Sequence, residues 1–513
     1  MMDEQAGQTT SLWMATEDVS EASVLTTSLT ADVCVIGGGI AGLSTAYCLA
    51  REGRSVVVVD DGPIGGGMTQ RTTAHLSNVI DDGYVEIERL HGEEGAALAA
   101  ASHTAAIDRI ERIITDERIS CDFERLDGYL FAQPGDEGSL SLERELLAAQ
   151  RAGLSNVERH ARAPISGLTS GPCVRFERQA QFHPLEYLSG LMRAIERRGG
   201  RIYTGTHVTK VEGGSPGRVE TEPGSVITAR AIVVATNTPI TDLVALHTKQ
   251  APYTTYVIGA RVPRGSVAKA LYWDMEDPYH YVRLYSDASG DRPYDVLIAG
   301  GEDHKTGQAD DGDVRYARLE AWAQQRFPMI EEIVYRWSGQ VMEPVDGLAF
   351  IGRDVGDSPN VYIATGDSGM GMTHGTIAGM LLTDLIVGRE SPWTRLYDPS
   401  RKTLQAMDTY AQENLNMAAQ YAEWVTAGEV GSPDEIARDS GAVIRRGLKK
   451  VAVYRGPEGD LHERSAVCTH LGCIVAWNQT EKTWDCPCHG SRFDKTGKVM
   501  NGPANSDLSP ITD

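Results

Sequence analysis

Two short segments near the C-terminus combine cysteine and histidine at close spacing. They read Cys468-Thr-His470-Leu-Gly-Cys473 and Cys486-Pro-Cys488-His489-Gly-Ser491. In a [2Fe–2S] cluster with mixed ligands, two thiolates bind one iron and two neutral imidazoles bind the other, so each segment can supply one ligand to each iron. A zinc site is the alternative, but zinc-finger histidines usually form a late pair on a helix, after a cysteine pair. The spacing therefore predicts a [2Fe–2S] cluster and leaves zinc as the less favoured interpretation, with the ligands Cys468, His470, Cys486 and His489.

Residues 440–510 resemble the respiratory type of Rieske protein, which carries this double motif. The resemblance implies that the two remaining cysteines of the motif, Cys473 and Cys488, form a disulfide that ties the two loops together over the cluster. Such a bond is unusual in a reducing cytoplasm, although burial by the loops can protect it. The resemblance also implies that Ser491 hydrogen-bonds a bridging sulfide.

One position departs from the Rieske pattern. Phe493 stands where that family has a tyrosine that donates a hydrogen bond to a ligand sulfur. A phenyl ring cannot donate this bond, so the reduced cluster is less stabilised and we expect a reduction potential below that of the respiratory proteins. Residues 502–504, Gly-Pro-Ala, resemble the proline loop that covers the cluster.

A glycine motif lies between two apolar runs near the N-terminus, within residues 32–60. The first run and a following helical pattern flank Gly37, Gly39 and Gly42, and the second run ends at Asp60. In such a βαβ unit the glycines permit a tight turn, the approach of a pyrophosphate and close helix–strand packing, while the acid binds a ribose hydroxyl. The N-terminus of the helix also stabilises phosphate charge. This segment therefore predicts a parallel sheet and a dinucleotide site.

Further segments resemble the D-amino-acid oxidase and glycine oxidase superfamily of FAD enzymes, over roughly residues 31–395. They are a glycine- and threonine-rich stretch at 65–75, an Ala-Thr-Asn element at 235–237, a segment at 346–352 and a glycine loop at 366–375. Beyond the glycine motif, the resemblance implies that FAD is bound by Thr69, Arg71, Thr72, Val208, Thr236, Gly352, Gly369, Gly371, Met372 and Thr373.

The same resemblance bears on how the flavin is attached. In the dimethylglycine-dehydrogenase branch of the superfamily, a histidine of the second segment forms a covalent flavin link. Arg71 occupies that position here. We therefore expect non-covalent FAD, with His75 as the alternative linking residue.

The patterns together predict an α/β (α+β) fold. A Rossmann-like FAD-binding domain with an inserted antiparallel substrate-domain sheet is followed by a small all-β Rieske domain. The expected organisation is an N-terminal extension (1–30), the FAD domain (31–395), a linker helix (396–427) and the Rieske domain (428–513). The extension is polar and acidic, as in a mobile arm or a short packed segment.

The expected linker helix has apolar residues at helical spacing, and this face should lie along another surface of the protein. These residues are Leu404, Met407, Ala411, Leu415, Ala418, Ala422 and Val425.

An amine-oxidase-like flavin domain fused to a Rieske domain resembles the Rieske-containing, gamma-glutamylputrescine oxidoreductase-like family. The resemblance implies an FAD-dependent dehydrogenase that oxidises a C–N bond of an amine or amino acid. Electrons then pass from the flavin through the cluster to an external acceptor, either a protein or a quinone-like molecule. Two alternatives stay open: an NAD(P)H-fed electron-transfer reductase, and a redox sensor or partner-binding protein. The reductase usually needs a second nucleotide fold, and the sequence contains no second strand–GxGxxG–helix unit.

Three residues of one expected strand are candidate substrate contacts, namely Tyr279, Tyr281 and Arg283. The arginine can pair with a substrate carboxylate through a bidentate fork, and the tyrosines can form an aromatic wall or hold an amine by cation–π contact. An ordinary half-buried strand with alternating aromatics explains the pattern equally well. We assign no catalytic base, because in this superfamily the flavin performs the chemistry.

The net charge of −23, from 71 acidic and 48 basic residues, disfavours nucleic acids and anionic membranes as partners. It suits cationic substrates or a basic redox partner, although many enzymes are simply acidic. No apolar run approaches the roughly 20 residues that span a bilayer. The first 30 residues contain no basic region followed by an apolar stretch, so we expect a cytoplasmic protein without a transmembrane segment.

Overall fold

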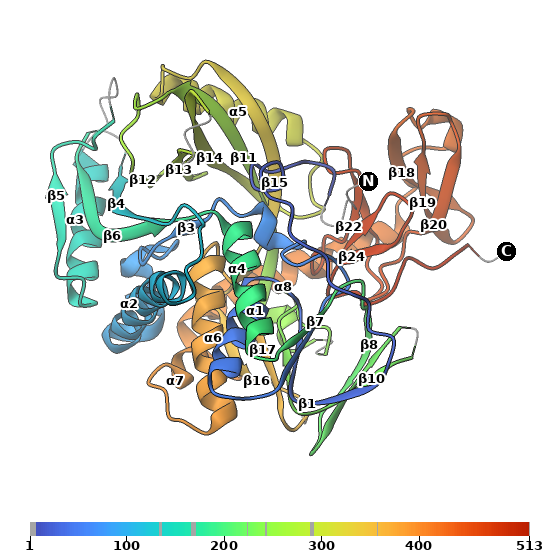
Figure 1. Cartoon of the computed structure of the whole chain (residues 1–513). Coiled ribbons are helices and arrows are strands. Elements are labelled where there is room, and N and C mark those ends of the chain that lie inside the picture. Colours follow the sequence, from blue (N-terminus) through green and yellow to red (C-terminus); the bar gives the residue numbers. More distant parts are fainter. Residues whose placement is uncertain are drawn as a thin grey trace.

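The computed structural model describes residues 7–132, 136–165, 171–222, 224–241, 244–287, 292–356 and 358–511. Its first unit is the predicted βαβ motif, in which the apolar strands β1 and β2 pair in parallel on either side of the connecting helix α1. The mixed α/β fold predicted from the sequence is confirmed. Figure 1 shows the two large sheets of the flavin domain beside the smaller C-terminal domain, drawn in orange and red.

The first sheet is the nucleotide-binding layer. Its central strands are parallel, and a β-hairpin formed by β8 (Val208–Glu212) and β9 (Gly217–Thr221) extends from β10. The strands lie in the spatial order β16 (Phe350–Arg353), β17 (Val361–Thr365), β10 (Val226–Val234), β1 (Leu29–Ile36), β2 (Val56–Val59) and β7 (Arg201–Tyr203).

Helices pack on this sheet through an apolar core. The closest pair is α1 with α6, where a Cβ added to Gly379 would lie 2.8 Å from Ser44, so only glycine permits this approach. The helices of the flavin domain are α1 (Ile40–Arg51), α2 (Gly83–Glu117), α3 (Asp136–Arg151), α4 (Pro184–Arg197), α5 (Gly312–Arg326) and α6 (Gly371–Val387).

The second sheet is mostly antiparallel, and α5 lies against β11 and β14. A further strand, β5 (Val157–His160), pairs with β6. The order is β15 (Glu332–Pro344), β11 (Gln250–Pro263), β14 (Tyr294–Lys305), β13 (His280–Tyr285), β12 (Leu271–Asp274), β4 (Glu124–Phe131), β6 (Cys173–Gln181) and β3 (His75–Leu76).

The C-terminal domain contains two small antiparallel sheets and its own core, in which Trp477 and Trp484 pack beside the cysteines of the double motif. The first sheet has β18 (Ser440–Arg446), β19 (Lys449–Arg455) and β20 (Leu461–Ser465), and the second has β21 (Ala476–Asn478), β22 (Thr483–Asp485), β23 (Arg492–Asp494) and β24 (Val499–Asn501).

The segment between the domains contains the short helix α7 (Thr394–Tyr397) and the helix α8 (Met407–Gln420), followed by a 3₁₀ helix at Tyr421–Val425. The expectation that its apolar face lies along another surface is wrong, since Leu404, Leu415 and Val425 are 75%, 72% and 78% exposed.

Polar side chains attach α8 instead. Glu413 pairs with Lys305, Asn414 donates to the carbonyl of Thr248, and the amide of Asn416 bonds that of Gln308. Spacing alone identified the helix but could not show that its contact face is polar.

The described part of the N-terminal segment packs against the flavin domain. Leu12 and Trp13 are fully buried. The indole Nε1 of Trp13 donates to the carbonyl of Thr72 (2.6 Å), and Ser11 donates to that of Gln70. Among the described helices, none is long and apolar enough to cross a membrane.

Trp13→Ala should destabilise the flavin domain by about 3–5 kcal/mol, because the truncation leaves a large cavity in the core. The loss should appear as a lower midpoint of thermal unfolding, followed by circular dichroism. Val24→Ala is the control in the same segment, since Val24 is 48% exposed and its truncation should change stability by less than about 0.5 kcal/mol. Equal effects of the two substitutions would contradict the packed arrangement.

Candidate redox site

A cavity of about 710 Å³ lies where the two large sheets and the C-terminal domain meet. This volume falls within the range of small-molecule sites, roughly 300–1,000 Å³. Most of the sequence-predicted flavin residues line it, namely Gly37, Gly39, Asp60, Thr69, Arg71, Thr72, Val208, Thr236, Gly369, Gly371 and Met372.

Three predicted residues do not line the cavity. Gly42 packs beneath the glycine turn, where an added Cβ would lie 1.8 Å from the carbonyl oxygen of Gly37. Gly352 faces Pro399, and the hydroxyl of Thr373 bonds Nδ1 of His103 (2.9 Å). These three residues pack outside the cavity lining and support the residues that form it.

The nucleotide end of the cavity has the geometry that FAD needs. Gly37 has φ +107°, and a side chain there would meet the carbonyl of Ala235 at 2.3 Å. Asp60 accepts a hydrogen bond from the backbone N–H of Gly62 (2.7 Å), and burial raises its pKa to about 7. An open glycine turn at a helix N-terminus, followed by a strand-terminal acid, fits the pyrophosphate and ribose of a dinucleotide.

The N-terminus of α6 also meets the cavity, and the N-terminal part of this helix packs against the start of α1 at Ile40 and Ala41. Gly369, Gly371 and Met372 line the cavity there, so the positive end of a 17-residue helix faces it. Such an end stabilises negative charge on a bound group.

Tyr279 and Tyr281 line the cavity on the side of the second sheet. The hydroxyl of Tyr279 donates to Asp81 (2.9 Å), and that of Tyr281 bonds the hydroxyl of Thr255 (2.8 Å). Burial raises the pKa of both phenols, and desolvation by the surrounding cavity walls raises the pKa of Asp81. Asp81 carried no motif that could have identified it from the sequence.

Arg283, the third candidate substrate contact, is placed elsewhere. It is 1% exposed and does not line the cavity. Its Nη1 donates to the carbonyl oxygens of Ala74 (2.8 Å), Thr73 and Phe182, and the guanidinium lies over the ring of Trp13. The arginine thus joins backbone segments, and the geometry gives no support to a bond with a substrate carboxylate.

Arg71 has a role that the flavin resemblance did not indicate. Its guanidinium pairs with Glu481 of the C-terminal domain (3.2 Å), and neither side chain is exposed by more than 1%. Glu481 also accepts hydrogen bonds from Thr9 and Ser338, and Arg71 donates to the carbonyl of Ser338. This buried ion pair joins the flavin segment to the C-terminal domain.

The two cysteine/histidine loops have matching backbones. Cys468 N–H donates to the carbonyl of Cys473, and Gly472 N–H donates back to that of Cys468; Cys486, Ser491 and Gly490 repeat this pattern with the same distances, 2.8 and 3.0 Å. Gly472 and Gly490 have φ +78° and +77°, a conformation that favours glycine. The two loops therefore have the same backbone conformation around their cysteine and histidine residues.

The predicted ligands meet between these loops. The rings of His470 and His489 lie 4.9 Å apart, and the hydrogen bond from the Cys486 thiol to the Cys468 sulfur lowers the pKa of Cys468 to about 7. Two thiols and two imidazoles form the donor set of a mixed-ligand [2Fe–2S] cluster.

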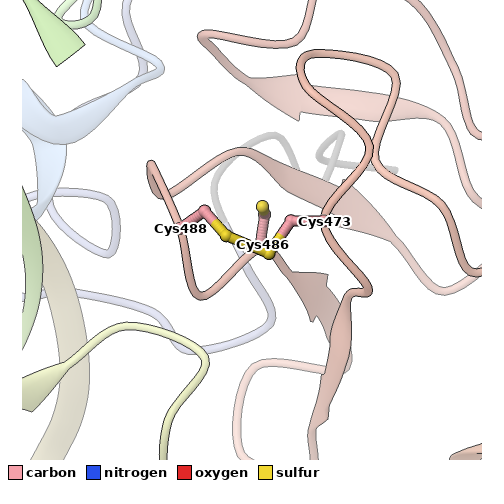
Figure 2. A group of neighbouring side chains, drawn as sticks. All are labelled: Cys473, Cys486 and Cys488. Carbon is pink, nitrogen blue, oxygen red and sulfur yellow. A yellow bond between two sulfur atoms is a disulfide. The ribbon is translucent and has the colours of Figure 1, made fainter. Parts of the chain in front are cut away.

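The predicted disulfide between Cys473 and Cys488 is confirmed. Figure 2 shows the Cys486 sulfur beside this bond. The predicted ligand Cys486 thus lies close to the disulfide that joins the two loops.

The two sites share a wall. Strand β24 of the C-terminal domain and the loop after it line part of the flavin cavity. The lining residues are Val499, Met500, Asn501, Gly502, Ala504 and Asn505. Gln340, which lines the same cavity from β15, donates a hydrogen bond to the carbonyl of Gly490 (2.9 Å), next to the predicted ligand His489. Its oxygen accepts from Asn501 (3.1 Å). No motif marked Gln340 in the sequence.

Comparisons with known proteins agree with this architecture. The family model described as FAD dependent oxidoreductase matches residues 32–385, and the Rieske [2Fe-2S] domain model matches residues 426–512. The chain belongs to this FAD-dependent oxidoreductase family and carries a Rieske domain. It is therefore an oxidoreductase with binding sites for FAD and a [2Fe–2S] cluster.

The putative Rieske 2Fe-2S iron-sulfur protein YhfW of Bacillus subtilis (strain 168) is 31% identical over 503 residues, 97% of both chains. Gamma-glutamylputrescine oxidoreductase of Escherichia coli (strain K12) is 29% identical over 71% of this chain and 85% of its own. The crystal structure of glycine oxidase from Geobacillus kaustophilus has a TM-score of 0.59 at 18% identity, covering 73% of this chain and 99% of that one. This last similarity shows the fold alone.

Phe493→Tyr should raise the reduction potential of the cluster. Phe493 is fully buried in the core that also contains the predicted ligands Cys468 and Cys486, so an added hydroxyl would enter the same core as their sulfur atoms. A donated bond stabilises the more negative reduced centre. Potentiometric titration followed by electron paramagnetic resonance measures the change, and an unchanged or lower potential would contradict the expectation.

Glu481→Gln should destabilise the docked arrangement by about 3–5 kcal/mol, because it leaves the buried charge of Arg71 without a partner. Chemical denaturation of the whole chain measures the loss. Glu463→Gln is the matched control in the same domain, since Glu463 pairs with Arg446 at the surface and such pairs contribute about 0–1 kcal/mol.

Proposed function

We propose that this protein is an FAD-dependent dehydrogenase that oxidises a C–N bond of an amine or amino acid. The electrons removed from the substrate pass from FAD through the Rieske cluster of the same chain to an external acceptor. The shared wall carries this proposal: residues of the C-terminal domain line the flavin cavity, and Gln340 connects that cavity to the loop that holds His489.

FAD bound in this cavity would supply an acceptor for a hydride from the substrate carbon, and a [2Fe–2S] cluster at the predicted ligands would supply a carrier that takes one electron at a time. The proton that remains from the hydride would leave to solvent. The nitrogen loses a proton to solvent as the C–N bond becomes C=N, and the acceptor takes two electrons in total. Water then hydrolyses the imine to a carbonyl compound and an amine or ammonia. The acceptor is a protein or quinone-like molecule outside the chain.

The cavity wall supports a substrate that carries an amine. Tyr279 and Tyr281 present aromatic rings 5.7 Å apart, and Asp81 adds a carboxylate beside them. Aromatic faces and a carboxylate suit a cationic nitrogen. Because Arg71 is committed to Glu481 and stands where related flavoenzymes have a linking histidine, we propose that FAD is bound non-covalently.

The printed names of similar proteins support the same substrate class. One relative is a gamma-glutamylputrescine oxidoreductase, and the structures that share the fold include a glycine oxidase and an L-proline dehydrogenase. All of these names describe compounds with an oxidisable carbon–nitrogen bond.

The test is anaerobic stopped-flow absorbance of the cluster-loaded protein, mixed with a panel of amines and amino acids and, separately, with NADH and NADPH. We expect an amine or amino acid to bleach the flavin, followed by loss of the oxidised-cluster bands. Bleaching by a nicotinamide alone would replace the proposal with a reductase. Bleaching by none of them would favour a redox sensor.

Cys486→Ser, which removes one cluster ligand, is the matched control for the second phase. With its flavin content verified, this variant should show bleaching without the later loss of cluster bands. In air it should release more hydrogen peroxide per turnover than the cluster-loaded protein, because oxygen becomes the remaining acceptor. Equal peroxide yields from both proteins would contradict a route through the cluster.

A further inference from the structure

A third histidine lies against the two histidine ligands. His247 belongs to a 3₁₀ helix of the flavin domain (His247–Lys249) that directly precedes β11, and it is 2% exposed. Its ring centroid lies 4.9 Å from that of His470 and 5.9 Å from that of His489, at interplanar angles of 78° and 63°. These edge-to-face contacts restrict the orientation of both ligand rings.

The chain around His247 also reaches the flavin cavity. Gln250, the first residue of β11, bonds the hydroxyl of Thr365 (3.2 Å), and Thr365 lines the cavity. The neighbouring Pro252 contacts the second cluster loop so closely that a Cβ on Gly490 would lie 2.5 Å from it. The segment from His247 into β11 therefore contacts both the flavin cavity and the second cluster loop.

The two sides of the cluster site differ in exposure. His489 is 3% exposed and faces the flavin domain, where Gln340 holds the adjacent Gly490. On the other loop, Thr469 is exposed and Leu471 is 36% exposed, on either side of His470. The flavin domain thus closes one side of the cluster site and leaves the other accessible.

We propose that His247 is a positioning residue for the cluster: from the flavin domain, it fixes the rings of His470 and His489 and makes this closed side the one through which the cluster receives electrons. The inference rests on the proposed function, in which a reduced flavin loses two electrons and the cluster takes up one at a time. Residues that orient metal ligands from outside the coordination sphere typically change affinity or activity about 10–100-fold when substituted.

The experiment compares His247→Leu and His247→Phe with the unaltered protein. The flavin is reduced by light with EDTA as the electron donor, so the measurement needs no substrate and is independent of the proposed amine chemistry. Three quantities are recorded: the rate of cluster reduction after the flash, the midpoint potential of the cluster, and its electron paramagnetic resonance spectrum after reduction by dithionite.

In His247→Leu we expect cluster reduction to slow about 10-fold, with a changed spectrum and a lower midpoint potential. The potential should fall because a less polar neighbour stabilises the added negative charge less. His247→Phe keeps the edge-to-face ring contact, so its spectrum and rate should stay close to those of the unaltered protein while its potential falls. This partial rescue separates ring orientation from general packing.

His91→Leu is the matched control, since His91 is a half-buried histidine of the flavin domain that neither lines the cavity nor contacts the cluster loops. It should change none of the three quantities. Unaltered rate, spectrum and potential in both His247 variants would overturn the proposal. If His247→Leu does not retain the cluster, His247→Phe decides: a lowered potential supports the proposal and an unchanged one overturns it.

Discussion

The buried ion pair between Arg71 and Glu481 fixes the relation of the two domains. Moving two charges out of water is costly, and their attraction compensates only when the geometry is good and the remaining polar atoms are hydrogen-bonded. Thr9 and Ser338 supply such bonds from the N-terminal segment and from β15. Since the two charges lie on different domains, their separation would break the pair and its hydrogen bonds and return both charges to water. The pair therefore favours a single docked arrangement over a loose tether.

The linker contributes to the same rigidity in a different way. Interfaces between domains usually permit relative motion unless they are large and well packed. Here an ion pair between Glu413 and Lys305 and hydrogen bonds between side-chain amides attach α8 to the flavin domain. On the other side, Met417 packs against the core of the Rieske domain. Because α8 contacts both domains, it restricts their relative motion. Leu415 of this helix is exposed and takes no part in these contacts.

Local chemistry explains which predictions could be made from the sequence. The glycine turn at Gly37 depends on residues close together in the chain, so its spacing encodes the geometry directly. The disulfide between Cys473 and Cys488 was implied by the resemblance to Rieske proteins, which rests on two short motifs. Arg283 could not be placed in this way, because three backbone carbonyls from two other segments compete for its guanidinium. The sequence placed Arg283 correctly on a strand, but the acceptors of its guanidinium come from segments far away in the chain.

The residues that join the two sites are invisible to motif analysis for the same reason. Gln340 and Gly490 are separated by 150 positions, and each has an ordinary role within its own strand or loop. Arg71 matched a flavin position, yet its bonding partner lies 410 residues away. Resemblance identified each domain from its own motifs, whereas the contacts between the domains depend on the folded arrangement of both.

Residues of the Rieske domain form part of the wall of the flavin cavity. Asn501 bonds Gln340, and Asn505 donates to the carbonyl of Val208 at the nucleotide end of the cavity. The N–H of Ala504, which lines the cavity, donates to Ser491 in the second cluster loop. One hydrogen bond thus joins the second cluster loop directly to a residue of the cavity wall.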